Sequence, residues 1–295
     1  MPLPAAFISV ILIWATTPLA IKWSAMGAGS SFAVFARMTL GTALCAALLV
    51  LFHVRLPLHG KAMLSYAVSG ASMFGTMALT YWSAQYVNSG IISLLFGLTP
   101  LITSLGAVLW LKEEAITPSK LAGMLLGLAG LALIFGGGLH AGAGVAIGLL
   151  ALLGGVSAQA MGLVWLKRIG DDSPPLATTL GSLAVALPLF FLSWWLGGAH
   201  WPQDMPERAM AATVYLGVVG SVLGFVLYFY MIKHMEAGRI ALVTLVTPVL
   251  ALLLGSNLNH EVVLPRVWFG AAAIMLGLAV HRWGPQWAAA LAARR

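Results

Sequence analysis

A Thr-Pro pair occurs twice in this chain, each time inside a long apolar segment: Thr99-Pro100 and Thr247-Pro248. A proline inside a helix removes one backbone hydrogen bond and leaves a carbonyl oxygen without its usual donor. In a membrane, protein groups or cavity water must satisfy that oxygen. Two such breaks at corresponding places indicate a binding site, and a kink that serves packing alone is the alternative.

Polar and aromatic side chains on the apolar segments extend this candidate site. We expect substrate contacts from Trp14, Thr17, Pro18, Tyr81, Phe96, Thr99, Pro100, Gln159, Trp165, Tyr228, Thr244, Thr247 and Pro248. Aromatic rings suit the apolar or aromatic part of a substrate. The alternatives are an interfacial position for Trp165, beside Lys167 and Arg168, and a helix-to-helix hydrogen bond for Gln159.

Arg37 is the only arginine or lysine that falls well inside an apolar segment. A charge at that depth usually faces a cavity or a partner. One interpretation is a contact to a substrate carboxylate. The other is structural, with the side chain reaching the outer interface or a backbone carbonyl.

The acidic residues argue against several kinds of chemistry, because all of them fall at segment ends or in connections: Glu113, Glu114, Asp171, Asp172, Asp204, Glu207, Glu236 and Glu261. Cation exporters driven by protons usually bury a carboxylate, so a neutral or zwitterionic substrate is favoured. The chain has no GxSxG or HExxH motif and no paired acids at one depth, so we expect no enzyme activity. The histidines lack metal-ligand spacing, and we expect neither metal nor cofactor.

The elements that position these residues are predicted to be membrane helices. Residues 62–111 and 121–166 contain no Asp, Glu, Lys or Arg, and the mean hydropathy is +0.98. About 20 apolar residues span a bilayer. The pattern predicts ten helices, all lying in membrane lipid, at 4–22, 32–53, 62–84, 91–111, 118–136, 142–166, 175–197, 209–232, 239–258 and 265–283.

The basic residues predict the orientation of these helices. With both termini in the cytoplasm, only Lys22, Arg208 and Arg266 lie on the outer side, while most other Lys and Arg lie on the inner side. This asymmetry follows the positive-inside rule. The formal net charge of +7 is therefore explained by topology, and we expect no nucleic-acid partner.

An internal repeat divides the chain. Residues 81–113 align with residues 229–261, which brings the two Thr-Pro pairs together and aligns Glu113 with Glu261. We expect one five-helix repeat at 1–138, a turn at Gly136–Gly138, and a second repeat at 139–295. Because each half has an odd number of spans, the second half enters the membrane inverted, as in many transporters.

These motifs resemble the EamA branch of the drug/metabolite transporter superfamily. The residues that carry the resemblance are 13–22, Phe35-Ala36-Arg37, the two Thr-Pro pairs, Glu113 and Glu261. The resemblance implies a central cavity lined by helices 1, 3, 4, 6, 8 and 9, and export of small metabolites. Exporters of aromatic and other neutral amino acids are the most similar members. Ala15 departs from the glycine that often follows the motif's tryptophan.

We therefore expect an all-α membrane protein with two inverted five-helix repeats around a cavity. Its expected function is secondary transport of small neutral or zwitterionic metabolites, above all amino acids, by alternating access. A proton-coupled exporter of organic cations or other metabolites is the alternative. The resemblance places it in a bacterial inner membrane, and we expect a monomer rather than a dimer.

Overall fold

A computed structural model describes residues 3–111, 117–140, 143–234 and 237–292, and every regular element in these ranges is helical. The elements are α1 (Leu3–Ser24), α2 (Ser30–Leu51), α3 (Gly60–Ser83), α4 (Ser89–Phe96), α5 (Thr99–Leu111), α6 (Pro118–His140), α7 (Ala143–Ile169), α8 (Pro175–Leu196), α9 (Glu207–Tyr215), the π-helix η1 (Leu216–Leu223), α10 (Gly224–His234), α11 (Ala237–Asn259) and α12 (Pro265–Ala292).

Most of these helices are long and apolar enough to cross a bilayer. Within the described ranges, eight helical stretches meet the length and hydropathy that a membrane span needs. Two shorter apolar stretches, Pro118–Ile134 and Val246–Asn259, lie in α6 and α11. The chain is therefore an all-α membrane protein, as its composition predicts.

Most predicted helix ends agree with the structure to within a few residues, but four details differ. The last helix, predicted to end at residue 283, continues to Ala292. The segment predicted as one helix over 91–111 is broken into α4 and α5 at Gly97 and Leu98. The turn predicted at Gly136–Gly138 is wrong, because α6 continues through these residues to His140. The segment predicted over 209–232 contains the π-helix η1 between α9 and α10.

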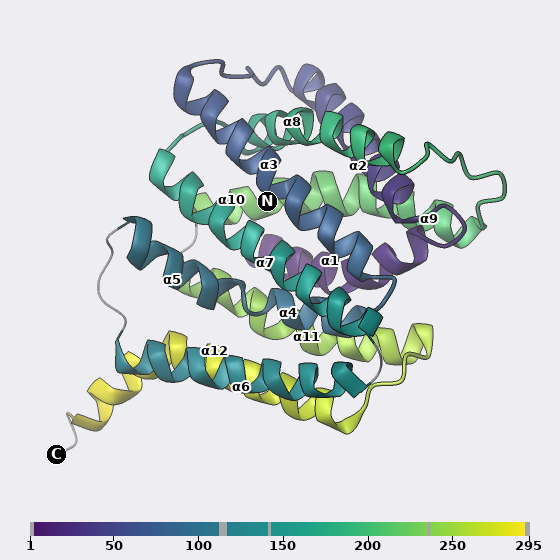
Figure 1. Ribbon diagram of the computed structural model, residues 1–295. Coiled ribbons are helices and arrows are strands. Elements are labelled where there is room, and N and C mark those ends of the chain that lie inside the picture. The colour runs from purple at the N-terminus through teal and green to yellow at the C-terminus, as the bar shows by residue number, and fades with distance from the viewer. Residues whose placement is uncertain (1–2, 112–116, 141–142, 235–236, 293–295) are drawn as a thin grey trace.

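Glycines bring the backbones of α6 and α12 together, and Figure 1 shows these two helices side by side along the lower edge. A Cβ atom at Gly123 would lie 2.5 Å from the Gly277 carbonyl oxygen, and one at Gly130 would lie 2.6 Å from that of Gly270. Any larger side chain at these positions would push the two helices apart.

The remaining helices pack so that the first and second halves of the chain interleave. Helix α1 contacts α11, α9 and α10, and α4 also contacts α11. Helix α3 packs on α7 and α8, α2 packs on α8 and η1, and α5 packs on α7. The helices run roughly across the view in Figure 1, with the α8–α9 and α11–α12 connections at the right. A cavity lies between the two halves.

Candidate functional site

One cavity has a volume of about 1000 Å³ and receives side chains from both halves of the chain. Helices α1, α2, α3, α4, α5, α7, α8, α10, α11 and α12 line it, together with η1. The spans that the family resemblance expects in the wall correspond to α1, α3, α4–α5, α7, η1–α10 and α11, and all of them contribute. Helices α2, α8 and α12 contribute as well. A volume of this size accommodates a small metabolite.

Ten of the fourteen candidate residues line this one cavity. They are Trp14, Thr17, Pro18, Arg37, Phe96, Thr99, Pro100, Gln159, Tyr228 and Thr247. Residues that are distant in sequence therefore meet in one cavity wall, and they include three of the four residues of the Thr-Pro pairs.

Four candidate residues do not line the cavity. Tyr81 is 1% exposed and packs inside the hydrophobic core. Trp165 is 40% exposed and lines a separate shallow depression, with the Arg168 guanidinium 5.2 Å from its ring centre, which fits the interfacial alternative. Pro248 is buried beside the break between α4 and α5. The side chain of Thr244 lies outside the described residues.

The aromatic part of the wall comes from helices α1, α4 and α10. The rings of Trp14 and Tyr228 lie 4.9 Å apart at an angle of 47°, and Phe96 and Phe225 line the same cavity. A tilted pair of this kind is favoured by aromatic quadrupoles and presents a large apolar surface. This part of the cavity can hold the apolar side of a substrate.

The two Thr-Pro pairs have different local structures. Pro100 cannot donate a backbone hydrogen bond to the Phe96 carbonyl, and the helix is broken just before Thr99. The Thr99 hydroxyl instead donates to that carbonyl oxygen at 2.7 Å. Pro248 lies inside the continuous helix α11. A Cβ atom at Gly97 would lie 3.7 Å from Pro248, so the break in one half contacts the proline of the other.

Several polar atoms of the cavity wall have no hydrogen-bond partner among the described residues. The buried acceptor Oε1 of Gln159 is one, and the hydroxyls of Ser65 and Thr103 are others. Buried polar groups are normally paired, and an unpaired one needs an explanation. Their position on a cavity makes them available to water or to a substrate.

The cavity reaches the molecular surface at the connection between α7 and α8. Exposed Gly170, Asp172 and Lys167 belong to its lining there. Away from this mouth, the charged residues of the described lining are Arg37 and Arg282, and both are arginines. An arginine at the centre of a membrane helix costs about 2.5–3.5 kcal/mol on insertion scales. The interior therefore contains a positive charge and no described carboxylate.

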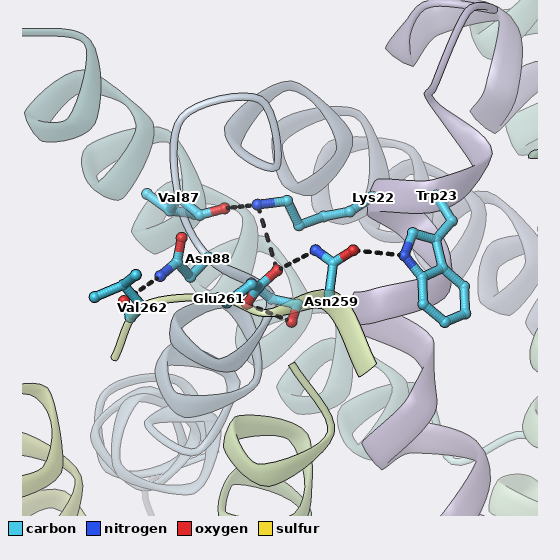
Figure 2. Close-up of polar contacts among 8 residues, drawn as sticks. Lys22, Trp23, Val87, Asn88, Asn259, Glu261 and Val262 are labelled. Carbon is cyan, nitrogen blue, oxygen red and sulfur yellow. Dashed lines mark hydrogen bonds and ion pairs between the residues drawn. The ribbon is translucent and has the colours of Figure 1, made fainter. Parts of the chain in front are cut away.

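At the opposite end of the bundle lies a set of polar contacts that we call the Glu261 cluster, formed by Lys22, Ser89, Asn259 and Glu261 (Figure 2). The Glu261 carboxylate accepts from the Ser89 backbone N–H at 2.9 Å, from the Ser89 hydroxyl at 2.8 Å and from Asn259 Nδ2 at 3.0 Å. Its Oε1 atom lies 3.5 Å from Lys22 Nζ, and its side chain is 5% exposed.

Further contacts tie the Glu261 cluster to the ends of α1 and α4. Lys22 Nζ donates to the Val87 carbonyl at 3.0 Å, and Trp23 Nε1 donates to Asn259 Oδ1 at 2.8 Å. The cluster joins elements of the first half to the end of α11. Sequence reasoning noted Glu261 as a repeat residue but missed this cluster. Glu113, its repeat counterpart, lies outside the described residues.

A helical membrane bundle around a cavity that both halves of the chain line has the architecture of a small-molecule transporter. Comparison with known sequences agrees: the profile of the EamA-like transporter family matches residues 4–136 and 146–282. The chain belongs to this family. It is a transporter and not an enzyme.

Individual relatives are similar over most of the chain. The "Uncharacterized inner membrane transporter YedA" of Escherichia coli (strain K12) is 27% identical over 94% of this chain and 90% of its own. A "Probable terminal-alkyne amino-acid exporter" of Streptantibioticus cattleyicolor is 26% identical over 92% of this chain and 91% of its own. The match to the "Uncharacterized transporter YvbV" of Bacillus subtilis, 26% identical, covers 60% of this chain and 57% of that protein.

A solved structure described as "Crystal structure of protein" has the same fold. Its TM-score is 0.68 at 21% identity, and the match covers 99% of this chain and 98% of the other. This likeness concerns the fold alone.

Proposed function

We propose that the protein moves small neutral or zwitterionic metabolites, above all amino acids, across a bacterial inner membrane by alternating access. The observation that carries the proposal is the cavity, which combines an aromatic wall, unpaired polar groups and no described carboxylate away from its mouth. A relative that is 26% identical is named a probable amino-acid exporter, which supports the substrate class.

We further propose that the two halves are inverted repeats of five spans each, at 1–138 and 139–295. The helix packing supports a two-fold relation between the halves. Helix α1 packs on α11, and its counterpart α7 packs on the α4–α5 pair, the counterpart of α11. In the same way α3 packs on α8, and η1 packs on α2. Helix α6 packs on its own counterpart α12. The family match in two stretches, 4–136 and 146–282, supports the same division.

In this arrangement the structure corresponds to the state that is open to the cytoplasm. The mouth at the α7–α8 connection lies on the side that the positive-inside rule assigns to the cytoplasm, and the Glu261 cluster closes the outer end. Transport requires this cluster to separate while the mouth closes. The absence of a carboxylate from the described interior favours movement of substrate down its own gradient.

Uptake into proteoliposomes tests this proposal. Labelled threonine, methionine and phenylalanine are offered without an imposed proton gradient, and at least one is expected to equilibrate faster than in protein-free liposomes. Uptake that occurs only with an imposed gradient contradicts the facilitator mechanism. Movement of organic cations with no amino-acid movement contradicts the substrate class and supports the proton-coupled cation exporter.

A further inference from the structure

Arg37 carries a buried positive charge that faces the cavity without a described counter-ion. The residue is 1% exposed and belongs to the cavity lining. Its Nε atom donates to the Ser221 hydroxyl at 2.9 Å, and its Nη1 atom lies 3.9 Å from the sulfur of Met77. Neither ion pair found among the described residues includes it. A guanidinium has five N–H donors, so most of its capacity remains free.

The surrounding backbone is shaped to admit this guanidinium. Ser221 lies in the π-helix η1, and π-helical turns inside α-helices occur frequently at functional sites. A Cβ atom at Gly220 would lie 3.2 Å from Arg37 Nη2, and one at Gly41 would lie 3.1 Å from Ser221 Cβ. Both glycines thus leave the space in which Arg37 and Ser221 meet.

A structural role alone does not account for this arrangement. A buried charge without a partner destabilises a fold, whereas an apolar side chain of similar volume fills the same space at no such cost. A single hydroxyl and a thioether supply little compensation for one full charge. An anion that enters from the cavity supplies it.

We propose that Arg37, positioned by Ser221, is the subsite for the carboxylate group of the substrate. This inference rests on the proposed function, since it assigns one end of a zwitterionic substrate. The planar fork of a guanidinium matches a carboxylate in a bidentate manner. The single positive charge of one guanidinium matches a carboxylate, whereas a phosphate dianion carries about two negative charges. The substrate's apolar part then contacts Trp14 and Tyr228.

Direct binding tests the subsite without relying on transport. Purified protein in detergent is titrated with 3-phenylpropanoate and with 3-phenylpropanamide, which differ only in the charged group, and binding is followed by tryptophan fluorescence. The wild type is expected to bind the carboxylate at least about tenfold more tightly than the amide, the range of a charge-assisted hydrogen bond. Arg37→Gln is expected to bind the carboxylate and the amide with dissociation constants within about twofold of each other.

Three further variants control this experiment. Arg55→Gln removes an exposed arginine outside the cavity and is expected to keep the preference for the carboxylate. Arg37→Lys keeps the charge without the planar fork, and it is expected to retain part of the preference. If Arg37→Gln fails to fold, Ser221→Ala serves instead, with an expected loss of about threefold or more in the preference. No preference in the wild type, or an unchanged preference in the folded variants, overturns the proposal.

Transport of labelled phenylalanine separates this inference from the proposed function. Arg37→Gln is expected to raise the half-saturating phenylalanine concentration by about tenfold or more. If the wild type transports phenylalanine and Arg37→Gln does not change the half-saturating concentration, the proposed function stands and the carboxylate subsite is overturned. Binding of 3-phenylpropanoate that depends on Arg37, together with no amino-acid transport, leaves the subsite standing and overturns the proposed substrate class.

Discussion

Glu261→Gln is expected to open the closed end of the cavity. The carboxylate accepts three hydrogen bonds, two from Ser89 and one from Asn259. A hydrogen bond to a charged group contributes about 1 kcal/mol more than a neutral one, so removing the charge weakens the three bonds by about 3 kcal/mol in total. The pair with Lys22 is partly exposed and adds roughly 0–1 kcal/mol. The population of the outward-open state is therefore expected to rise by roughly a hundredfold.

Cysteine labelling measures this shift. Cys45 is fully buried and is replaced by alanine, and Ser93, which lines the cavity and is 4% exposed, is replaced by cysteine. A membrane-impermeant thiol reagent is applied from the side that carries Glu261. We expect Glu261→Gln to raise the labelling rate at least about tenfold, within the shift worked out above.

Glu207→Gln is the matched control for this measurement, because Glu207 is an exposed acid on the same side of the bundle. Its labelling rate is expected to equal that of the parent. If Glu261→Gln inserts and folds but labels within about twofold of the parent, a shift of about 3 kcal/mol is refuted. The Glu261 cluster would then have no part in closing the cavity.

Three more outcomes follow from the packing. Gly255→Ala is expected to open the same end, with faster labelling in the assay above, because its Cβ atom would lie 2.7 Å from Glu261 Oε2. Gly277→Ala is expected to lower the unfolding temperature in detergent through an overpacking cost of about 1–3 kcal/mol, because its Cβ atom would lie 2.6 Å from a backbone oxygen of α6. Gly60 has open space around it, so Gly60→Ala is expected to leave the unfolding temperature unchanged. Trp14→Ala is expected to reduce proteoliposome uptake at least about tenfold through lost aromatic contact. Tyr81→Phe is expected to preserve it, because it removes a buried hydroxyl outside the cavity that has no partner among the described residues.

Much of the fold could be predicted from local signals. Uncharged runs such as 121–166 require membrane spans, and turn residues between them fix the helix ends. Glycine is an ambiguous signal in this respect. Gly136–Gly138 suggested a turn but is helical, while Gly97 accompanies the break between α4 and α5. The π-helix η1 has no local sequence signal that we recognise.

Part of the cavity lining could be predicted where the chemistry of a residue type limits its position. A proline inside a span and an arginine at depth both indicate a cavity, and Pro18, Pro100 and Arg37 line one, whereas Pro248 packs beside the break between α4 and α5. Aromatic side chains carry no such limit. Tyr81 and Trp165 do not line the cavity, because a ring suits the core or the interface as well as a cavity and the direction in which each ring points depends on neighbouring helices.

The Glu261 cluster could not be predicted because its members come from three separate helix ends. Lys22, Ser89 and Asn259 meet only after α1, α4 and α11 have packed together. The repeat alignment identified Glu261 as a position of interest, but its hydrogen-bond partners depend on tertiary structure.

Counterflow in proteoliposomes tests most directly whether this cavity carries an amino acid in alternating access. Vesicles are loaded with a high concentration of unlabelled phenylalanine and diluted into a trace of the labelled form, with a protonophore present. The labelled amino acid is expected to accumulate transiently inside the vesicles, and Trp14→Ala is expected to abolish this accumulation. Absence of accumulation with well-inserted wild-type protein, repeated for methionine and threonine, would contradict this expectation.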